Sequence, residues 1–530
     1  MSFLDHVFDA VRRFYIMTLE AILKIRIAVL IAAAGLFVSI PFLVMGTKSE
    51  LAPTEDQGIL FFTGTGPPTA TLHYMSKYAA QIKKICDSFP QTQRVFQVNG
   101  FSFVSPGQNT LVGGMLLKPW NERTVTQQQI LPILDKKLKA VAGVQVAAFP
   151  LPSLPGSAGG FPVQFVIKTT HTFSELDQVA NRMLKAAMAS HKFVFLTKDI
   201  RFDDPQVKIK IHRKIAADLG FTAAQITSDL QPLLGGNFVN RFDLEGRSYK
   251  VIPQLADARR ATTEQLKNYY IRTNSGAMIP LSTIVSIRHV VEPEFIAQFQ
   301  QLNAATLEGV PAPGVSLGQA LNYLKNLSKK ILPPGYAIDY ASQSRQYLEQ
   351  GNAIVVTFVL SIILVFLMMA AQFESFIDPL IVMFTVPMSI FGALIFLFLG
   401  VATLNIYTEV GLITLIGLIT KQGILIVEFA NRLQEEEGLS RHEAIVKASS
   451  VRLRPILMTT GAMVFGVVPL LVATGAGAVS RRDMGLMLAA GLSIGCLFSL
   501  YVVPVIYSFI ASVKHKVTTS DTEAGPAGTA

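Results

Sequence analysis

The sequence is poor in cysteine and in charged residues, and each shortage limits what the protein can be. Cys86 and Cys496 are its two cysteines, one in a polar stretch and one in an apolar run. A structural disulfide or a cysteine-based metal site is therefore not expected. Charged residues make up 15% of the chain and hydrophobic residues 50%, whereas soluble proteins average roughly 25% charged residues. This balance favours a membrane protein.

Motifs for catalysis are also missing. The chain has no Ser/His/Asp order, phosphate loop or zinc-ligand spacing that would indicate an enzyme, and its eight histidines are not clustered. No cofactor and no metal are expected. The formal net charge of +10 would suit nucleic-acid binding. However, the basic residues gather beside apolar runs, as they do at the cytoplasmic ends of membrane spans, so no nucleic-acid partner is predicted.

Long apolar runs are present, and their spacing is uneven. Each is near the roughly 20 residues that a helix needs to cross a bilayer. One run comes first, none follows through 47–350, and five are packed into the rest. The runs lie at 27–45, 353–371, 379–399, 410–430, 455–474 and 484–511. This layout predicts a polytopic α-helical membrane protein with six transmembrane helices and one large extramembrane domain.

The ends of the spans indicate which side faces the cytoplasm. Basic clusters precede the first span, separate the fourth from the fifth, and follow the sixth, so an even number of crossings puts all three on one side. Arg481 and Arg482, in a short outer loop, run against this rule. The expected parts are an interfacial amphipathic helix at 1–25, a first transmembrane helix at 26–46, a periplasmic domain at 47–350, a five-helix bundle at 351–512 and a cytoplasmic tail at 513–530.

Strand-like and helix-like runs alternate through the large domain. Repeated strand–helix–strand patterns of this length predict two small α/β subdomains, each with helices on one sheet face, and an inserted third subdomain. The proline- and glycine-rich segment 149–162 is the expected linker between these repeats.

Lys421 is the residue that points most directly to function. It lies in the middle of the fourth span, where a charge costs about 2.5–3.5 kcal/mol to insert. One interpretation is a lysine that snorkels to an interface. The other is a functional ammonium that needs an anion. However, Glu409, Glu428 and Asp483 lie at span ends, and Asp378 lies at the edge of a cytoplasmic loop. We therefore expect the anion to come from another chain, and such a pair suits a proton-driven switch.

Four stretches then resemble a known family. They are ELAPTEDQG (50–58), VNGFSFVSPGQNT (98–110), GLITKQGILIVEFANRL (417–433) and VRLRPILMTT (451–460). They look like the C-terminal half of acriflavine-resistance-type (hydrophobe/amphiphile efflux) multidrug pumps of the resistance-nodulation-division (RND) superfamily. The resemblance covers all but the C-terminal end of the chain.

The resemblance implies a secondary transporter, not an enzyme. It implies a proton antiporter of the bacterial inner membrane that exports amphiphilic drugs and is driven by the proton-motive force. It also implies βαβ-type porter subdomains with a docking subdomain, a trimeric assembly, a periplasmic adaptor protein and an outer-membrane channel.

The family's proton carriers are a pair of aspartates in the first half, which this sequence lacks. Met1 lies in what is the cytoplasmic connector of a full-length pump, so an N-terminal half polypeptide is the expected partner. By resemblance, Lys421 is the switching partner of those aspartates, Thr459 adds a hydroxyl to the relay, and Arg452 adds a guanidinium on the cytoplasmic side. Two simpler interpretations stay open, since Thr459 could bond back to its own helix and Arg452 could be a positive-inside anchor.

The drug pathway is represented by one loop and its aromatic surroundings. Gly100 and Gly107 bound a stretch that matches the family's flexible loop between drug pockets, and glycine permits backbone freedom. Phe96, Phe101 and Phe103 match its aromatic wall, although aromatic residues at such spacing are also typical of a core. The sequence departs from the family at Gly114, where well-known members have phenylalanine, and at Pro106.

Other functions stay open on the sequence. The chain could be an inactive fragment of a split or broken pump gene, or an RND exporter of another substrate such as metal ions. A protein-translocation factor of the same superfamily has a similar layout, but its characteristic motifs are not visible here.

Overall fold

The computed structural model describes residues 2–102, 107–154, 160–234, 236–256, 259, 262–273 and 276–511. The chain divides into two compact units. The first contains residues 1–66, 71–199 and 297–530, and the second contains 67–70 and 200–296. Phe103, Pro106, part of the expected linker and the expected tail at 513–530 lie outside the described residues.

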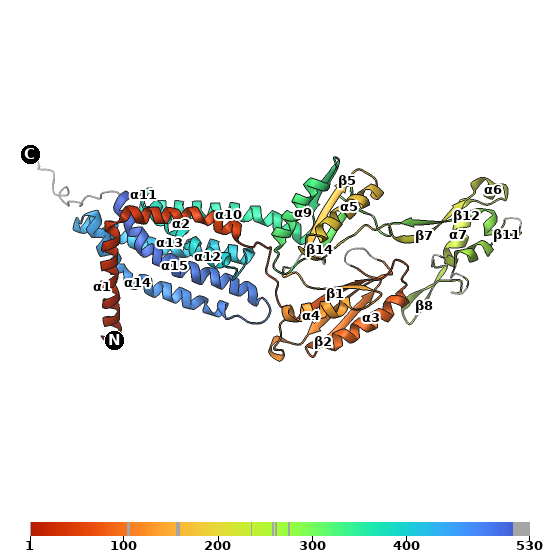
Figure 1. Cartoon of the computed structure of the whole chain (residues 1–530), viewed down its shortest axis with the longest axis horizontal. Helices are drawn as coiled ribbons and strands as arrows, with labels where there is room; N and C mark the ends of the chain where they lie inside the picture. Colours follow the sequence, from red (N-terminus) through yellow and green to blue (C-terminus); the bar gives the residue numbers. More distant parts are fainter. Residues whose placement is uncertain are drawn as a thin grey trace, which may run out of the picture. The chain divides into compact units, whose positions relative to one another are not determined.

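Long apolar helices make up the C-terminal part of the first unit. Six helical stretches of the described chain are long and apolar enough to cross a membrane: α2 (Arg26–Gly46), α10 (Ser342–Phe373), α11 with α12 (Ile377–Met383 and Thr385–Phe398), α13 (Ile406–Glu437), α14 (Arg441–Leu471) and α15 (Ala478–Ile510). Figure 1 shows them side by side as a bundle, with α1 (Ser2–Lys24) crossing its end. Every apolar run expected to span the membrane overlaps one of these helices, and α10 and α14 begin well before their runs.

The centre of the bundle is formed by α12, α13 and α15, which pack through small residues. A Cβ atom at Gly491 of α15 would lie 2.2 Å from Leu415 of α13, and one at Gly495 would lie 2.7 Å from Ser389 of α12. Glycine at these two positions therefore lets the backbones approach closely. The apolar stretches of α11 with α12, of α13 and of α15 are about half or more buried (61%, 50% and 56%). Those of α2, α10 and α14 are 6%, 6% and 17% buried.

The first α/β subdomain is a four-stranded antiparallel sheet in the order β2-β3-β1-β4. Its elements are β1 (Ile59–Thr65), α3 (Leu72–Asp87), β2 (Thr92–Asn99), β3 (Thr110–Leu117), the 3-10 turn η1 (Trp120–Glu122), α4 (Gln127–Lys139) and β4 (Gln145–Pro150). Because β3 lies between β1 and β2, the chain forms a split β-α-β arrangement. Figure 1 shows α3 and α4 on one face of the sheet.

The second α/β subdomain repeats this topology. Its elements are β5 (Val163–Thr169), α5 (Phe173–Met188), β6 (Phe193–Lys198), β13 (Ala297–Phe299), β14 (Leu302–Pro311), α9 (Leu317–Ile331) and β15 (Tyr336–Tyr340). Strand β14 lies between β5 and β6, and β15 pairs with the other edge of β5. Residues 200–296, which belong to the second unit, are inserted between β6 and β13.

The inserted unit has its own small core. It contains β7 (Asp204–Ile211), α6 (Arg213–Asp218), α7 (Ala223–Leu234), β8 (Asn240–Leu244), β9 (Arg247–Val251), the 3-10 turns η2 (Thr263–Asn268) and η3 (Leu281–Thr283), β10 (Tyr270–Arg272), β11 (Met278–Pro280) and β12 (Val285–Glu292). Strands β7 and β12 form an antiparallel ribbon. Phe221, Ile226 and Leu281 are buried at the centre of this unit.

Glu308 of β14 is a buried carboxylate in the second subdomain. It is 8% exposed, and its Oε2 atom has no hydrogen-bond partner among the described residues. Burial, followed by repulsion from Asp199, raises the pKa of Glu308 to about 8. The folded state therefore keeps a proton that the unfolded state releases near pH 4.5, so stability should fall as the pH rises from there to about 8.

We expect Glu308→Gln to remove this decline, because a neutral amide cannot ionise. Thermal unfolding of the purified chain at pH 5 and pH 8 measures the effect, with the exposed Glu122→Gln as control. Parallel pH profiles for the wild type and Glu308→Gln would contradict the assignment.

Candidate relay and aromatic sites

Lys421 lies on a face of α13 that the rest of the described chain leaves open. From the start of this helix to Glu428, the exposed residues recur at intervals of three, four and seven, which puts them on one stripe. The stripe consists of Val410, Thr414, Gly417, Lys421 and Glu428. A Cβ atom at Gly417 would meet no atom within 4 Å. The ammonium of Lys421 therefore lies on an open surface of the bundle, with the small residues Thr414 and Gly417 next to it on the stripe.

Thr459 lies at the same height on the neighbouring helix α14. The Nε2 atom of Gln422 donates a hydrogen bond of 2.7 Å to Oγ1 of Thr460, and this bond joins α13 to α14 inside the bundle. Lys421 and Thr459 each precede a member of this pair by one residue. The hydroxyl of Thr459 donates to the carbonyl of Ile456 at 3.1 Å, which uses its proton and leaves its oxygen able to accept.

Arg452 lies about 10 Å before Thr459 along α14, since the helix rises 1.5 Å per residue. Its guanidinium carbon is 4.6 Å from the centre of the Phe429 ring on α13. Its Nε atom is buried without a hydrogen-bond partner in the described part of the chain. The side chain is thus held against α13 by a cation–π contact and keeps an unused donor.

The described residues provide no carboxylate to Lys421, for which the structure shows no ion pair or hydrogen bond. The two buried acids of the bundle are engaged elsewhere. Oδ2 of Asp378 accepts from Asn431 at 2.9 Å, and Oδ2 of Asp483 accepts from Asn405 at 2.9 Å. Glu428 shares the stripe with Lys421, but it is seven residues away along the helix, about 10 Å.

A polar network near the end of α13 was not predicted from the sequence. Besides its contact with Asp378, Asn431 accepts a 2.7 Å hydrogen bond from Tyr507 of α15, and Tyr507 accepts one of 2.6 Å from Gln434. All four side chains are buried. Amides and a tyrosine within apolar runs were a visible signal, since buried polar groups need partners. The network fixes α11, α13 and α15 to one another.

The aromatic candidates lie in the first α/β subdomain. Phe96 of β2 is 41% exposed and packs edge-on against Phe61 of β1, with ring centres 5.7 Å apart. Both residues pair with Gly114, which lies on the strand between them. A Cβ atom at Gly114 would lie 2.3 Å from the Phe96 ring. The absence of a side chain at Gly114 therefore creates the space that the Phe96 ring fills.

The loop glycines lie at the ends of the segment that contains Phe103. Gly100 has a φ of +79°, which favours glycine, and its N–H donates to the carbonyl of Thr110 at 2.7 Å. The carbonyl of Gly107 accepts from both the N–H and the hydroxyl of Thr110. Phe101 is 46% exposed beside Gly100. Thr110 thus joins both ends of the loop, while Phe103 itself is outside the described residues.

We expect Gly114→Phe to displace the Phe96 ring and to destabilise the subdomain by about 1–3 kcal/mol, as overpacked substitutions do. Thermal unfolding of the full chain measures the loss. Adding Phe96→Ala to Gly114→Phe should recover most of it, because the smaller side chain frees the space. A loss that is the same with and without Phe96→Ala would show that the two positions do not compete.

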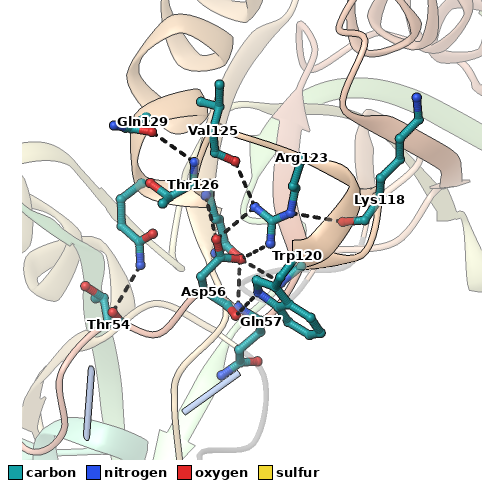
Figure 2. Close-up of polar contacts among 12 residues, drawn as sticks. Thr54, Asp56, Gln57, Lys118, Trp120, Arg123, Val125, Thr126 and Gln129 are labelled. Carbon is teal, nitrogen blue, oxygen red and sulfur yellow. Dashed lines mark hydrogen bonds and ion pairs between the residues drawn. The ribbon is translucent and has the colours of Figure 1, made fainter. Parts of the chain in front are cut away.

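An ion pair anchors the start of β1 (Figure 2). The guanidinium of Arg123 donates to both carboxylate oxygens of Asp56, at 2.5 and 2.8 Å, and also to the carbonyls of Lys118 and Val125. The backbone N–H of Gln127, at the start of α4, donates to Asp56 as well. Burial alone would raise the pKa of Asp56, but these hydrogen bonds outweigh it and hold the pKa below its usual range.

A helical bundle that carries two copies of a split β-α-β subdomain defines a class of polytopic membrane protein to which RND transporters belong. A model of the AcrB/AcrD/AcrF family matches residues 2–511. The chain therefore belongs to the AcrB/AcrD/AcrF family of the RND superfamily, whose members are secondary transporters of the inner membrane.

Individual relatives support the same family. The chain is 40% identical over 518 residues to an uncharacterized transporter of Haemophilus influenzae, covering 97% of this chain and 50% of that protein. It is 31% identical over 513 residues to the multidrug/solvent efflux pump membrane transporter MepB of Pseudomonas putida, covering 96% and 49%. It is also 31% identical over 500 residues to the multidrug resistance protein MdtF of Escherichia coli K12, covering 93% and 47%. The chain thus spans about half the length of the curated relatives it matches.

Proposed function

We propose that this chain forms the C-terminal, lysine-bearing half of a proton-driven RND multidrug efflux transporter. The observation that carries the proposal is the open stripe of α13, where Lys421 has no anionic partner among the described residues. An ammonium at this depth would be costly against lipid. A second half with mid-span carboxylates would cover the stripe and supply the missing charge.

The proposed chemistry is a reversible charge pair. While the partner carboxylates are ionised, Lys421 is attracted to them across the helix interface. Protonation of a carboxylate removes that attraction, so the ammonium is released and the interface can shift. Thr459, whose oxygen remains able to accept, and Arg452, with its unused Nε donor, lie along the same side of α14 as further members of the relay.

The exposed helices are consistent with a second half. Helices α2, α10 and α14 bury little of their apolar windows. A Cβ atom added at Gly461 or Gly466 of α14, like one at Gly417 of α13, would meet no other atom within 4 Å. Small residues on an apolar face let another helix pack closely. An N-terminal half RND polypeptide is the partner that fits these faces.

The proposed substrates are amphiphilic drugs. Phe96 and Phe101 are exposed beside a glycine-bounded loop, and aromatic side chains suit bulky apolar ligands. The names of MepB and MdtF, a multidrug/solvent efflux pump and a multidrug resistance protein, favour the same class. The proposed assembly is a trimer in the bacterial inner membrane, with the α/β subdomains in the periplasm beside an adaptor protein and an outer-membrane channel.

Purification of the tagged chain from its native membranes, followed by mass spectrometry, tests the proposal. We expect a stoichiometric membrane protein with two mid-span aspartates to co-purify, unless the same polypeptide supplies them. Recovery of this chain alone, with no aspartate-bearing half attached, would favour an inactive pump fragment instead.

A further inference from the structure

Twelve residues, 47–58, connect the end of α2 to the start of β1, and we call them the connecting segment. Most connections of this length run over the surface. Here Leu51, Ala52 and Glu55 are 3%, 6% and 4% exposed. Much of the segment is therefore packed against the rest of the chain, although it contains no helix or regular strand.

The first half of the connecting segment is bound to the loop before α13. Ser49 and Leu404 form a parallel β-bridge, and backbone hydrogen bonds join Glu50 to Leu404 at 3.0 Å and Leu404 to Lys48 at 2.8 Å. The hydroxyl of Thr403 donates to the carboxylate of Glu50 at 2.7 Å. This half of the segment must therefore move together with the start of α13, the helix that carries Lys421.

Glu55 binds the first turn of α15. Its carboxylate accepts hydrogen bonds from the backbone N–H groups of Val479 and Ser480, at 3.2 and 2.7 Å, and from the Ser480 hydroxyl. These are N–H groups that the helix itself cannot satisfy, and the helix dipole favours a negative charge there. A residue from more than 400 positions away thus caps α15 (|i−j| 425).

Asp56 faces the other way. It forms the ion pair with Arg123 and accepts from the N–H of Gln127, both in the first α/β subdomain (Figure 2). Glu55 and Asp56 are consecutive residues, yet their carboxylates bind different parts of the molecule, the start of α15 and the start of α4. The Cα atoms of neighbouring residues are about 3.8 Å apart, so no flexible residue separates the two attachments.

We propose that Glu55 and Asp56 form a two-sided joint that makes the first α/β subdomain move with the outer ends of α13 and α15. Glu55 is a positioning residue, since it acts through α15 and touches neither relay residues nor aromatic candidates. In the transporter proposed above, on which this role in transport rests, a displacement of α13 and α15 that accompanies charge changes at Lys421 would reach β1 through this joint.

A distance measurement tests the joint without relying on transport. Nitroxide labels at Lys136→Cys of α4 and Thr474→Cys of the loop before α15, both exposed, report the subdomain and the bundle in the full chain in lipid nanodiscs. Cys86 and Cys496 are replaced by alanine. We expect a narrow distance distribution by pulsed electron paramagnetic resonance, and a distribution about twice as wide in Glu55→Ala, because motions that the contact had restrained are released.

Two further variants sharpen the test. Glu55→Gln keeps one acceptor oxygen and should widen the distribution less than Glu55→Ala. Glu122→Ala removes an exposed carboxylate of the first α/β subdomain and should leave the distance distribution unchanged. Should Glu55→Ala fail to fold, Ser480→Ala removes one of the three hydrogen bonds from the helix side. An unchanged distance distribution in Glu55→Ala overturns the proposal, and if Glu55→Ala does not fold, an unchanged distribution in the combined Glu55→Gln and Ser480→Ala variant does so.

Export provides the second readout. Glu55→Ala should lower the maximal export rate while the substrate concentration for half-maximal rate stays the same, since the aromatic site is untouched. Export at the wild-type rate together with a widened distribution would overturn the role of the joint in transport. If the wild-type chain exports nothing in any assembly, the proposed function falls, and the distance measurement still decides whether the joint exists.

Discussion

Lys421→Ala should abolish export and leave membrane insertion intact. In the proposed transporter the ammonium pairs with carboxylates of the partner half away from water. Removing one member of such a pair costs about 3–5 kcal/mol, because the remaining charge stays buried and unpaired. Each 1.4 kcal/mol is a factor of ten, so the export rate should fall by at least about a hundredfold. Efflux of a fluorescent amphiphilic dye from cells that contain both halves measures the rate.

Lys447→Ala is the matched control for this substitution. Lys447 lies on the neighbouring helix α14, is exposed and pairs with Glu437. An exposed ion pair contributes little, about 0–1 kcal/mol, so export should stay near the wild-type rate. Membrane fractionation should find equal amounts of both variants in the bilayer. Normal efflux by Lys421→Ala beside its partner half would show that the relay assignment is wrong.

Each apolar run identified in the sequence overlaps a long apolar helix of the structure, because one physical requirement determines such runs. Roughly 20 consecutive apolar residues are enough to cross a bilayer, and few other structures need them. Boundaries were less predictable. Helix α14 begins at Arg441, well before the apolar run at 455, because Ser440 caps its first turn by accepting from the N–H of Glu443 and a polar extension can be helical outside the lipid.

The polar contacts inside the bundle were not predictable from spacing. Lys421 could be singled out because a charge in mid-span is expensive wherever it points. Whether Gln422 would meet Thr460, or Tyr507 would meet Asn431, depends on which helices are neighbours and on their rotation. Neither follows from the apolar pattern of a single helix. The joint at Glu55 was missed for the same reason, since its partner Ser480 is 425 residues away.

The aromatic candidates show what a one-dimensional pattern leaves open. From the sequence, Phe96 could be interpreted either as part of a drug-facing aromatic wall or as a residue of the domain core. The sheet register distinguishes the two interpretations in part, because the Phe96 ring lies over Gly114 and Phe96 remains 41% exposed. The departure at Gly114 is thereby explained by packing, and the role of Phe96 toward a substrate remains a proposal.

Arg123→Met should destabilise the first α/β subdomain by about 3–5 kcal/mol, the usual result of removing one partner of a buried ion pair. The guanidinium side chain is 2% exposed and the Asp56 side chain 13%, so water cannot replace the lost contact. Hydrogen exchange of β1 and α4 in the full chain measures the free energy of local opening. The exposed Arg94→Met on β2 is the control and should change it by less than about 0.5 kcal/mol.

The opening free energies of the wild type and of Arg123→Met should respond to acid in opposite directions. In the wild type the pKa of Asp56 is lowered, so its contribution is fully present above the unfolded pKa of about 3.9 and is lost as the pH falls through the folded value. Without Arg123, burial, which is the largest single influence on this carboxyl, is opposed by the backbone N–H groups of Gln127 and Gly58 alone, and we expect it to favour the neutral acid. The opening free energy of Arg123→Met should then rise on acidification, opposite in sign to the wild type.

Asp56→Asn combined with Arg123→Met provides the decisive comparison. The double variant removes the unpaired charge and retains an amide oxygen for the N–H of Gln127. It should therefore be more stable than Arg123→Met alone at neutral pH, and its opening free energy should no longer change near pH 4. If the double variant is as unstable as the single one, the lost stability comes from the other contacts of Arg123, with Lys118, Val125 and Trp120. The ion pair would then not be what holds β1 to α4.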